Sequence, residues 1–344
     1  MARVSLSTIV VAHDSLAELR RSLPPLVEQL TAADELIVVD NASSDGLETE
    51  LARLAPGARL LRLTHNVGFA AGANHGAEAA RGELIVLLNP DAIVQPRWAE
   101  AIRAPWGGSW AAWMGLVMLK DGSAINTSGG VLHFTGFGWA GQIGEPAEAA
   151  PPALAEVGFL SGACLAIPAV TWREAGGFPE HFFMYCEDVD LSLRLRLTGA
   201  TLAVAPDAQV THEYQFVKGG RKWRLLERNR WATLIRTYPG VLLLAVSPAL
   251  LAAEFAVWAM ALRGGWGRMK ALATLDLARG LPRLLHERRA VQAGRRVSAS
   301  AFAAAMTFEL SSPYFGAIAR RPVVTNLLRI YWRMVLALLR YSAG

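Results

Sequence analysis

Residues 84–91 of this 344-residue chain read LIVLLNPD, five apolar residues followed by an amide, a proline and a carboxylate. A short, uninterrupted apolar run is typical of a strand that is buried on both faces, as in a parallel sheet. Similar runs occur earlier in the chain, at residues 4–12, 35–39 and 59–63. We therefore predict that residues 84–88 form one strand of a parallel sheet.

Segments with helical spacing of apolar residues alternate with these runs, at residues 15–31, 47–54 and 72–80. Alternating strands and helices predict an α/β fold, a mainly parallel sheet with helices on both faces. Further along, we expect strands at residues 157–167 and 201–210, a helix with an acidic start at residues 187–197, and a loop or short hairpins at residues 121–157.

Polar clusters follow the predicted strands, at His13-Asp14 and at residues 40–46, 66–74 and 89–91. Ligands of such folds bind at the carboxyl ends of the strands. The common position of these clusters is therefore the strongest indication of a site that the residues alone provide.

The net charge of +5 conceals an asymmetry between two parts of the chain. Residues 1–217 carry a formal charge of −11, with 13 Lys and Arg against 24 Asp and Glu, whereas residues 218–344 carry +16, with 21 against 5. This asymmetry predicts a domain at residues 1–217 and a second, basic region at residues 218–344. The apolar content of residues 218–344 favours an anionic membrane surface as their partner. Nucleic acid is the other usual partner of a basic region, but we do not expect it to bind here.

Two segments of the basic region are apolar enough to contact lipid. Residues 240–262 contain one charged residue, Glu254, and are long enough to span a bilayer, but Pro248 and Glu254 leave an interfacial helix equally open. Residues 323–340 combine Leu, Ile, Trp and Val with arginines, as in-plane amphipathic helices do. We expect a helical membrane-associating region, although core helices would also fit.

The two cysteines, Cys164 and Cys186, are too few for a disulfide scaffold, and they fit a reducing cytosol. The first residues, MARVSLSTIVVAHDS, contain a short apolar run without a small-residue cleavage site. We read this run as a strand and not as a signal peptide.

Each polar cluster allows a chemical and a structural interpretation. The Asp40 carboxylate can accept from a nucleobase or ribose, or it can form an Asx turn. The glycine-rich residues 66–76 can bring backbone close to a phosphate at a helix start, or they form a tight turn. Asn89 and Asp91 lie two residues apart and can share a divalent cation with a diphosphate, or they belong to an Asn-Pro turn.

A third group of polar residues lies further along the chain. Residues 178–194 place three acids, at positions 187, 188 and 190, between apolar residues at a helix start. One of these carboxylates could take a proton from a hydroxyl, or all could simply cap the helix. His212 follows the predicted strand 201–210, and it could be a metal ligand or a structural histidine.

The motifs DNASSDG, NVGFAAGANHG, LLNPD, FLSGA and GGFPEHFFMYCEDVDLSLR, followed by a histidine, resemble in this order the family 2 glycosyltransferases of the GT-A fold. The resemblance covers residues 4–215 and is greatest to bacterial rhamnosyltransferase-type enzymes of lipid-linked glycan synthesis. It implies an inverting transfer of a sugar, with rhamnose as one candidate, from a dTDP-, UDP- or GDP-sugar to a polyprenyl-diphosphate-linked acceptor. It also implies the cytoplasmic face of the inner membrane as the location.

The resemblance further implies roles for particular residues. Those implied to bind the nucleotide are Ala12, His13, Asp40, Asn66, Gly72, Asn74 and Asn89. Asp91 and His212 would hold Mg²⁺ or Mn²⁺, in a weaker site than the family's two-acid motif provides, because Asn89 replaces the first acid. Asp188 would be the catalytic base, with Glu187 beside it.

Other functions stay open at this point. The chain could transfer sugar to a soluble or protein acceptor, or it could be a non-catalytic membrane assembly partner with the same fold. A sugar-phosphate nucleotidyltransferase is disfavoured, because Ala12-His13-Asp14-Ser15 stands where such enzymes have a glycine-rich basic loop. A processive polysaccharide synthase is also disfavoured, because we find neither several spanning segments nor a Q-x-x-R-W motif.

Overall fold

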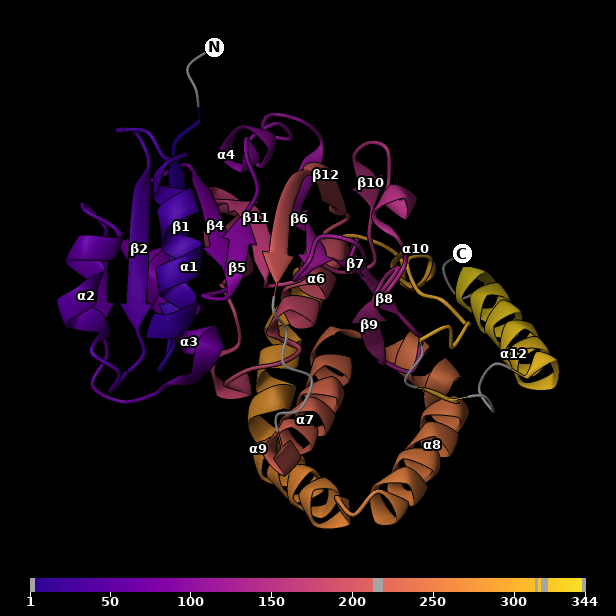
Figure 1. Cartoon of the computed structure of the whole chain (residues 1–344). Coiled ribbons are helices and arrows are strands. Elements are labelled where there is room, and N and C mark those ends of the chain that lie inside the picture. Colours follow the sequence, from indigo (N-terminus) through magenta and orange to yellow (C-terminus); the bar gives the residue numbers. More distant parts are fainter. Residues whose placement is uncertain (1–3, 213–218, 313–314, 317–320, 342–344) are drawn as a thin grey trace. The chain divides into compact units, whose positions relative to one another are not determined.

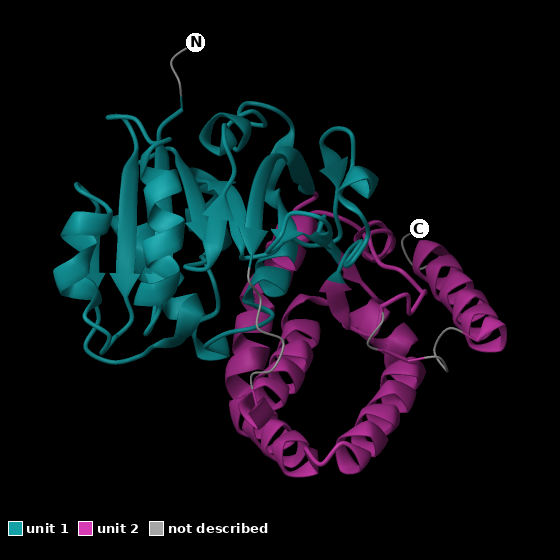
Figure 2. Ribbon diagram, viewed as in Figure 1, with its two compact units in different colours: residues 1–130, 140–192, 200–216 teal, residues 131–139, 193–199, 217–344 magenta. Residues whose placement is uncertain are grey.

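A computed structural model describes residues 4–212, 219–312, 315–316 and 321–341. The chain divides into two compact units, coloured separately in Figure 2. Unit 1 comprises residues 1–130, 140–192 and 200–216, and unit 2 comprises residues 131–139, 193–199 and 217–344. Two short segments before residue 217 thus group with unit 2, and the predicted domain boundary at 217/218 stays a prediction.

A mixed sheet of ten strands forms the centre of unit 1 (Figure 1). Its strands are β1 (Leu6–Ala12), β2 (Glu35–Asp40), β3 (Arg59–Arg62), β4 (Leu84–Leu88), β5 (Ala92–Val94), β6 (Trp110–Leu119), β7 (Ile125–Thr127), β10 (Ala155–Glu156), β11 (Cys164–Pro168) and β12 (Thr201–His212). The order is β10-β12-β6-β11-β4-β1-β2-β3, while β5 pairs with β12 and β7 with β6.

Strand direction places the carboxyl ends of the main strands at one edge of the sheet. β3, β2, β1 and β4 are parallel to one another, and β12 is parallel to β6. β11 lies between β4 and β6 and is antiparallel to both, so β6 and β12 run in the same direction as β4. The mainly parallel α/β prediction is confirmed, and the ends of β1, β2, β4 and β12 share the edge where the polar clusters were predicted.

The helices of unit 1 are α1 (Leu16–Val27), α2 (Leu47–Leu54), α3 (Gly68–Ala79), α4 (Trp98–Ala101), α5 (Ala169–Ala175) and the start of α6 (Glu187–Leu197), with 3-10 turns η1 (Ala147–Ala149) and η2 (Glu180–Phe182). α1 continues through Pro24 and Pro25 and buries Leu19, Leu23 and Leu26. α3 lies against β1, and its small residues set how closely the two approach: a Cβ on Gly76 would lie 2.4 Å from Ile9 Cγ2.

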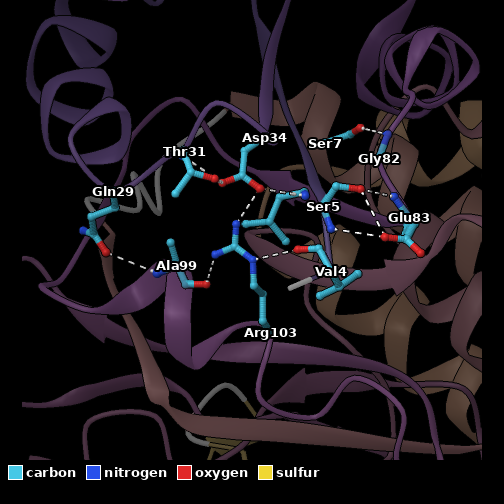
Figure 3. A network of polar contacts seen from close by, with 11 residues as sticks. Val4, Ser5, Ser7, Gln29, Thr31, Asp34, Gly82, Glu83, Ala99 and Arg103 are labelled. Carbon is cyan, nitrogen blue, oxygen red and sulfur yellow. Dashed lines mark hydrogen bonds and ion pairs between the residues drawn. The ribbon is translucent and has the colours of Figure 1, made fainter. Parts of the chain in front are cut away.

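The opposite edge of the sheet is held by a buried arginine (Figure 3). Arg103, just after α4, donates from Nε to the Val4 carbonyl at 3.0 Å and also to the Ala99 carbonyl. Its second terminal nitrogen lies 2.5 Å from Asp34 Oδ1, and Asp34 accepts from the Leu6 N–H at 2.9 Å. Both side chains are buried. This contact fastens α4 to the starts of β1 and β2.

Unit 2 is mostly helical. Its elements are α7 (Gly219–Thr237), α8 (Gly240–Arg263), α9 (Gly267–Ala293), α10 (Ala299–Ala303) and α12 (Pro322–Tyr341), with most of the hairpin of β8 (Gly130–Leu132) and β9 (Gly138–Ala140). α7 packs along α9, with Arg224 held on Asp276 by two hydrogen bonds of 2.6 and 2.8 Å. α8 and α12 are long and apolar enough to cross a membrane, judged by length and composition.

Candidate active site

A carboxylate, an imidazole and an amide converge after β4 and β12. His212 Nε2 lies 2.9 Å from Asp91 Oδ1 and 3.2 Å from the Asn89 side-chain amide nitrogen. His212 is the last residue of β12 and pairs with Ala92 at the start of β5, which brings it beside the Asn89–Asp91 turn. Residues 121 positions apart are thus in contact because β5 folds back onto β12.

This group can take part in binding a divalent cation, but it does not enclose one. Among the described residues no cluster of three or more His, Cys, Asp and Glu could hold a metal. Asp91 and His212 supply two donors, and Asn89 could add its amide oxygen. A hard cation in a nucleotide site commonly takes its other ligands from phosphate oxygens and water, so the donor set fits a cation held jointly with a diphosphate.

The two predicted acids open α6 at the same edge of the sheet. Asp188 Oδ2 accepts from the Gly162 N–H at 3.1 Å, and Asp188 Oδ1 accepts from the Val189 N–H at 2.8 Å. Gly162 immediately precedes the Ala163-β11 segment, and the Ala163 carbonyl accepts from the Asn89 N–H at 3.1 Å. The base candidate is therefore tied through the residues before β11 to the turn that carries Asp91.

Burial separates the chemistry of the two acids. Glu187 is buried, and its Oε2 has no hydrogen-bond partner. Burial, and then the charge of Asp188, raises the pKa of Glu187 well above its usual range. Burial also raises the pKa of Asp188, although the N–H groups of Gly162 and Val189 oppose this rise. Burial therefore disfavours the ionised form of Glu187 more strongly than that of Asp188.

The chain just before these acids has an unusual backbone. Phe183, Tyr185 and Cys186 have positive φ values of 65°, 71° and 64°. Non-glycine residues in such conformations cost about 1–3 kcal/mol each and persist only where the surroundings hold them. Here the Phe183 carbonyl accepts from the Ala70 N–H at 3.1 Å, which links this segment to the first turn of α3.

Asn74 on α3 holds the same segment from a second point. Its Oδ1 accepts from the Phe178 N–H at 2.9 Å, and its Nδ2 donates to the Phe178 carbonyl at 2.9 Å and to Glu180 Oε1 at 3.2 Å. The side chain was predicted to line the nucleotide pocket. Its polar atoms contact the loop that leads into α6, which indicates a positioning role, and its place in a nucleotide pocket stays a prediction.

The nucleobase candidates lie at the ends of β1 and β2. Ala12 is buried, and its carbonyl accepts from the Asn41 N–H at 2.8 Å, whereas His13 is exposed beside Asp14. Asp40 is buried; its Oδ1 accepts from the Ser43 N–H at 2.7 Å, and its Oδ2 lies 3.8 Å from Arg62 Nε. The Asx-type turn that was the structural interpretation is thus present, and nucleobase binding stays a prediction.

The first turn of α3 differs from the expected open phosphate site. The Gly68 N–H donates to Asn66 Oδ1 at 2.9 Å, and the Ala70 N–H is taken by Phe183. Gly68 has a φ of 88°, and a Cβ there would lie 2.4 Å from the Phe183 carbonyl oxygen. We expected the glycines to leave this backbone open to a phosphate. The N–H groups of Gly68 and Ala70 are not open, because they donate to oxygen atoms of the chain itself.

Two further positions have packing roles. Gly72 faces β1, where a Cβ would lie 2.7 Å from Val11 Cγ1, so it allows close helix–strand packing, and its nucleotide contact stays a prediction. Asn41, which was not singled out from the sequence, is buried; it accepts from the Val67 N–H and donates to Asn66 Oδ1 and to the Gly68 carbonyl. Its only sequence signal was its position after Asp40, within an apparent turn.

Comparison with known proteins identifies a family to which part of unit 1 is similar. Residues 7–123 match the family model of glycosyl transferase family 2. Residues 7–123 are a family 2 glycosyltransferase domain. This domain includes β1, β2 and β4 and the turn with Asn89 and Asp91, so the predicted resemblance is confirmed.

Two relatives of this chain are named as a rhamnosyltransferase and as an O-antigen biosynthesis protein. An N-acetylglucosaminyl-diphospho-decaprenol L-rhamnosyltransferase of Mycobacterium tuberculosis is 28% identical over 235 residues, which cover 60% of this chain and 75% of that protein. The O-antigen biosynthesis protein RfbC of Myxococcus xanthus is 25% identical over 224 residues, which cover 60% of this chain and 17% of that protein.

Solved structures share the fold of this chain. GalNAc-T7 with UDP, GalNAc and Mn²⁺ superposes with a TM-score of 0.59 at 16% identity, over 72% of this chain. The chain spans about half of that structure, 51% of its length. Residues 1–349 of TarS from S. aureus superpose with a TM-score of 0.50 at 14% identity, over 98% of this chain and 92% of that one. The GT-A fold prediction is confirmed.

Proposed function

We propose that this glycosyltransferase moves a sugar, with inversion, from a nucleotide-diphosphate sugar to a polyprenyl-diphosphate-linked glycan at a membrane. The observation that carries the proposal is the placement of Asp188 and the Asp91–His212 pair at one edge of the sheet, linked by the backbone contacts of Gly162 and Ala163. One group is suited to holding a diphosphate and the other to accepting a proton.

Asp188 would act as the general base. The residue is half-buried, and its raised pKa makes it a better proton acceptor than an ordinary Asp. As the acceptor oxygen attacks the anomeric carbon, its proton passes to Asp188, and the bond from that carbon to the diphosphate oxygen breaks. Attack opposite the leaving group in one displacement inverts the anomeric centre.

Glu187 would support this step without taking part in it. Burial raises the pKa of its carboxyl, which disfavours a second negative charge beside Asp188. A retaining double displacement would need a carboxylate nucleophile that reaches the sugar. Glu187 is poorly suited to that role, because it is buried, which supports the inverting course.

Asp91 and His212 would hold Mg²⁺ or Mn²⁺ together with the donor diphosphate. When bound there, the cation supplies positive charge that stabilises the departing diphosphate. The convergence of a carboxylate and an imidazole within 2.9 Å, with Asn89 beside them, supports this assignment. Replacement of an acid by Asn89 predicts weaker metal binding than in a site with two carboxylates.

The acceptor and the location follow from the relatives and from unit 2. The Mycobacterium tuberculosis relative is named for a decaprenyl-diphosphate acceptor and for L-rhamnose, which makes dTDP-rhamnose the first donor to test. α8 and α12 expose apolar side chains, and residues 218–344 carry a formal charge of +16. These features support association with an anionic membrane surface, and we place the enzyme at the cytoplasmic face of the inner membrane.

A transfer assay with several donors tests this function. Membranes that contain the expressed chain would receive labelled dTDP-rhamnose, UDP-sugars or GDP-sugars, with Mg²⁺ or Mn²⁺ and added N-acetylglucosaminyl-diphospho-polyprenol. We expect label from one donor in the organic phase, absent from control membranes. Label only in water-soluble product would contradict the lipid acceptor, and the absence of label in both phases for every donor would contradict the proposed reaction.

A further inference from the structure

α8 has two apolar stripes on different sides of the helix. Five residues face the interior of unit 2 and are buried: Leu242, Val246, Leu250, Val257 and Ala261. A second set at helical spacing is between 48% and 77% exposed: Val241, Leu244, Leu251, Phe255 and Leu262. The helix therefore packs on protein along one side and presents an equally apolar face along the other.

The one charged residue between positions 240 and 262 points into unit 2. Glu254 Oε1 lies 2.7 Å from Lys270 Nζ, while Glu254 Oε2 lies 3.3 Å from Arg230 and accepts from Trp231 Nε1 at 2.9 Å. Lys270 and Arg230 are buried and both also contact Glu227, at 2.7 and 3.0 Å. We call Glu227, Arg230, Glu254 and Lys270 the buried charge cluster.

The buried charge cluster is incompatible with α8 crossing a bilayer. Its cations come from α7 and α9, which also carry exposed or half-buried arginines such as Arg228, Arg268 and Arg279. If α8 spanned the membrane, either these helices would enter the hydrocarbon with it, or Glu254 would enter without its partners. Both outcomes place charges in lipid, which is unfavourable. Tyr331 of α12 adds a further attachment, since its hydroxyl donates to the Ala245 carbonyl at 2.6 Å.

The exposed face of α8 fits the surface of an anionic bilayer. Exposed Arg263 follows the stripe, and exposed Arg268 begins the next helix. Near this turn Trp223 and Trp266 stack with ring centres 5.0 Å apart, and tryptophan favours the membrane–water interface. An apolar face with flanking arginines is what a helix lying in that interface presents to acyl chains and anionic headgroups.

We propose, on the basis of the membrane association proposed above, that α8 lies in the plane of an anionic membrane with its exposed stripe in the headgroup–acyl boundary. The buried charge cluster holds the helix in this orientation by keeping Glu254 on the protein side. α8 is then an interfacial anchor and not a transmembrane helix, although its length and composition would allow a span.

Depth measurements distinguish these two arrangements. A fluorophore would be attached to Leu244→Cys, Leu251→Cys or Leu262→Cys in the full chain carrying Cys186→Ser, bound to vesicles of anionic and zwitterionic phospholipid. The lipids would carry bromine either near the headgroup or near the chain end. A helix in the plane predicts that all three positions are quenched mainly by the shallow bromines and to the same extent. Val246→Cys on the buried stripe is the matched control and should be quenched much less.

A span predicts a different profile, because residue 251 would lie about 10 Å deeper than residue 244. Stronger quenching of position 251 by the deep bromines would therefore overturn the inference while leaving membrane association intact. Flotation with the vesicles without quenching at any stripe position would also overturn it, because another surface would then bind lipid. A chain that does not float with the vesicles would contradict the membrane association itself.

Discussion

Substitution of Asp188 by Asn separates proton transfer from donor binding. The exchange keeps the size and shape of the side chain and removes its ability to take a proton. General-base assistance contributes roughly 10²–10⁴-fold to a rate, so we expect kcat to fall by about that factor, which corresponds to about 2.7–5.4 kcal/mol in the barrier. The affinity for the donor should change little, because the nucleotide candidates lie outside α6.

The structure also predicts a cost in stability. Asp188 accepts from two backbone N–H groups, of Gly162 and of Val189. An Asn at this position can accept with its oxygen from only one of them and turns an NH₂ group toward the other. A polar group left without its partner costs about 1–3 kcal/mol. Thermal unfolding of the variant should therefore be measured first, and kinetics should be compared at a temperature where both proteins are folded.

Two measurements then decide the result. Donor binding would be titrated by calorimetry, and initial rates of transfer would be measured at saturating donor and acceptor. We expect near-normal affinity together with the loss of rate. Turnover close to wild type by the folded variant would refute the role of Asp188, and loss of donor binding by the folded variant would refute the separation of functions.

Three further predictions concern the metal, the buried acid and the fold. Asp91→Ala should raise the Mn²⁺ concentration needed for half-maximal transfer, and an unchanged metal titration would remove this residue from the cation site. The pKa of Glu187 is higher in the folded state than in the unfolded state. Its contribution to the free energy of unfolding is therefore complete below the pKa of the unfolded state, and it is lost as pH rises through the pKa of the folded state. Glu187→Gln cannot titrate, so its melting temperature should lack this decline, and parallel melting curves from pH 4 to 8 would contradict the burial effect. Arg103→Met should cost about 3–5 kcal/mol of unfolding free energy, because it leaves Asp34 buried without its partner, and denaturant unfolding that shows a loss below about 1 kcal/mol would contradict this account.

The strands and helices that could be predicted are those whose apolar pattern is uninterrupted and ends in polar residues. The predicted strand 84–88 and the helices at 47–54 and 187–197 have the observed bounds. β6 was not predicted, although it lies in the middle of the sheet. Gly115 interrupts its pattern, and glycine usually weakens a strand; here it is needed because a Cβ would lie 2.3 Å from the Ala208 carbonyl oxygen.

Other elements were only partly foreseen, for a related reason. Residues 121–157 contain β7, the β8–β9 hairpin, η1 and β10, elements of two or three residues that are too short to show an apolar pattern. The expected strand at 157–167 is shorter, because β11 begins only at Cys164. The ends of such a strand depend on its pairing with neighbouring strands, and the local sequence pattern does not predict this pairing.

The candidate site divides in the same way. The proximity of Asp91 and His212 could be expected from their places after strands, since parallel strands end at one edge of a sheet. The contacts of Asn74 and Asn41 could not, because they depend on where the loops at residues 178–183 and 66–68 come to lie. An amide is as suitable for holding a loop as for binding a nucleotide, and only the fold decides between the two.

The most direct test of the proposed catalysis is the structure of the product formed by the purified chain. The enzyme would be incubated with the active donor, Mn²⁺ and N-acetylglucosaminyl-diphospho-polyprenol in detergent, and the anomeric configuration of the new linkage would be determined by NMR. We predict a lipid-linked product whose transferred sugar has the configuration opposite to that in the donor. A product with retained configuration, or transfer to water alone, would contradict an inverting enzyme with Asp188 as its base and a lipid-linked acceptor.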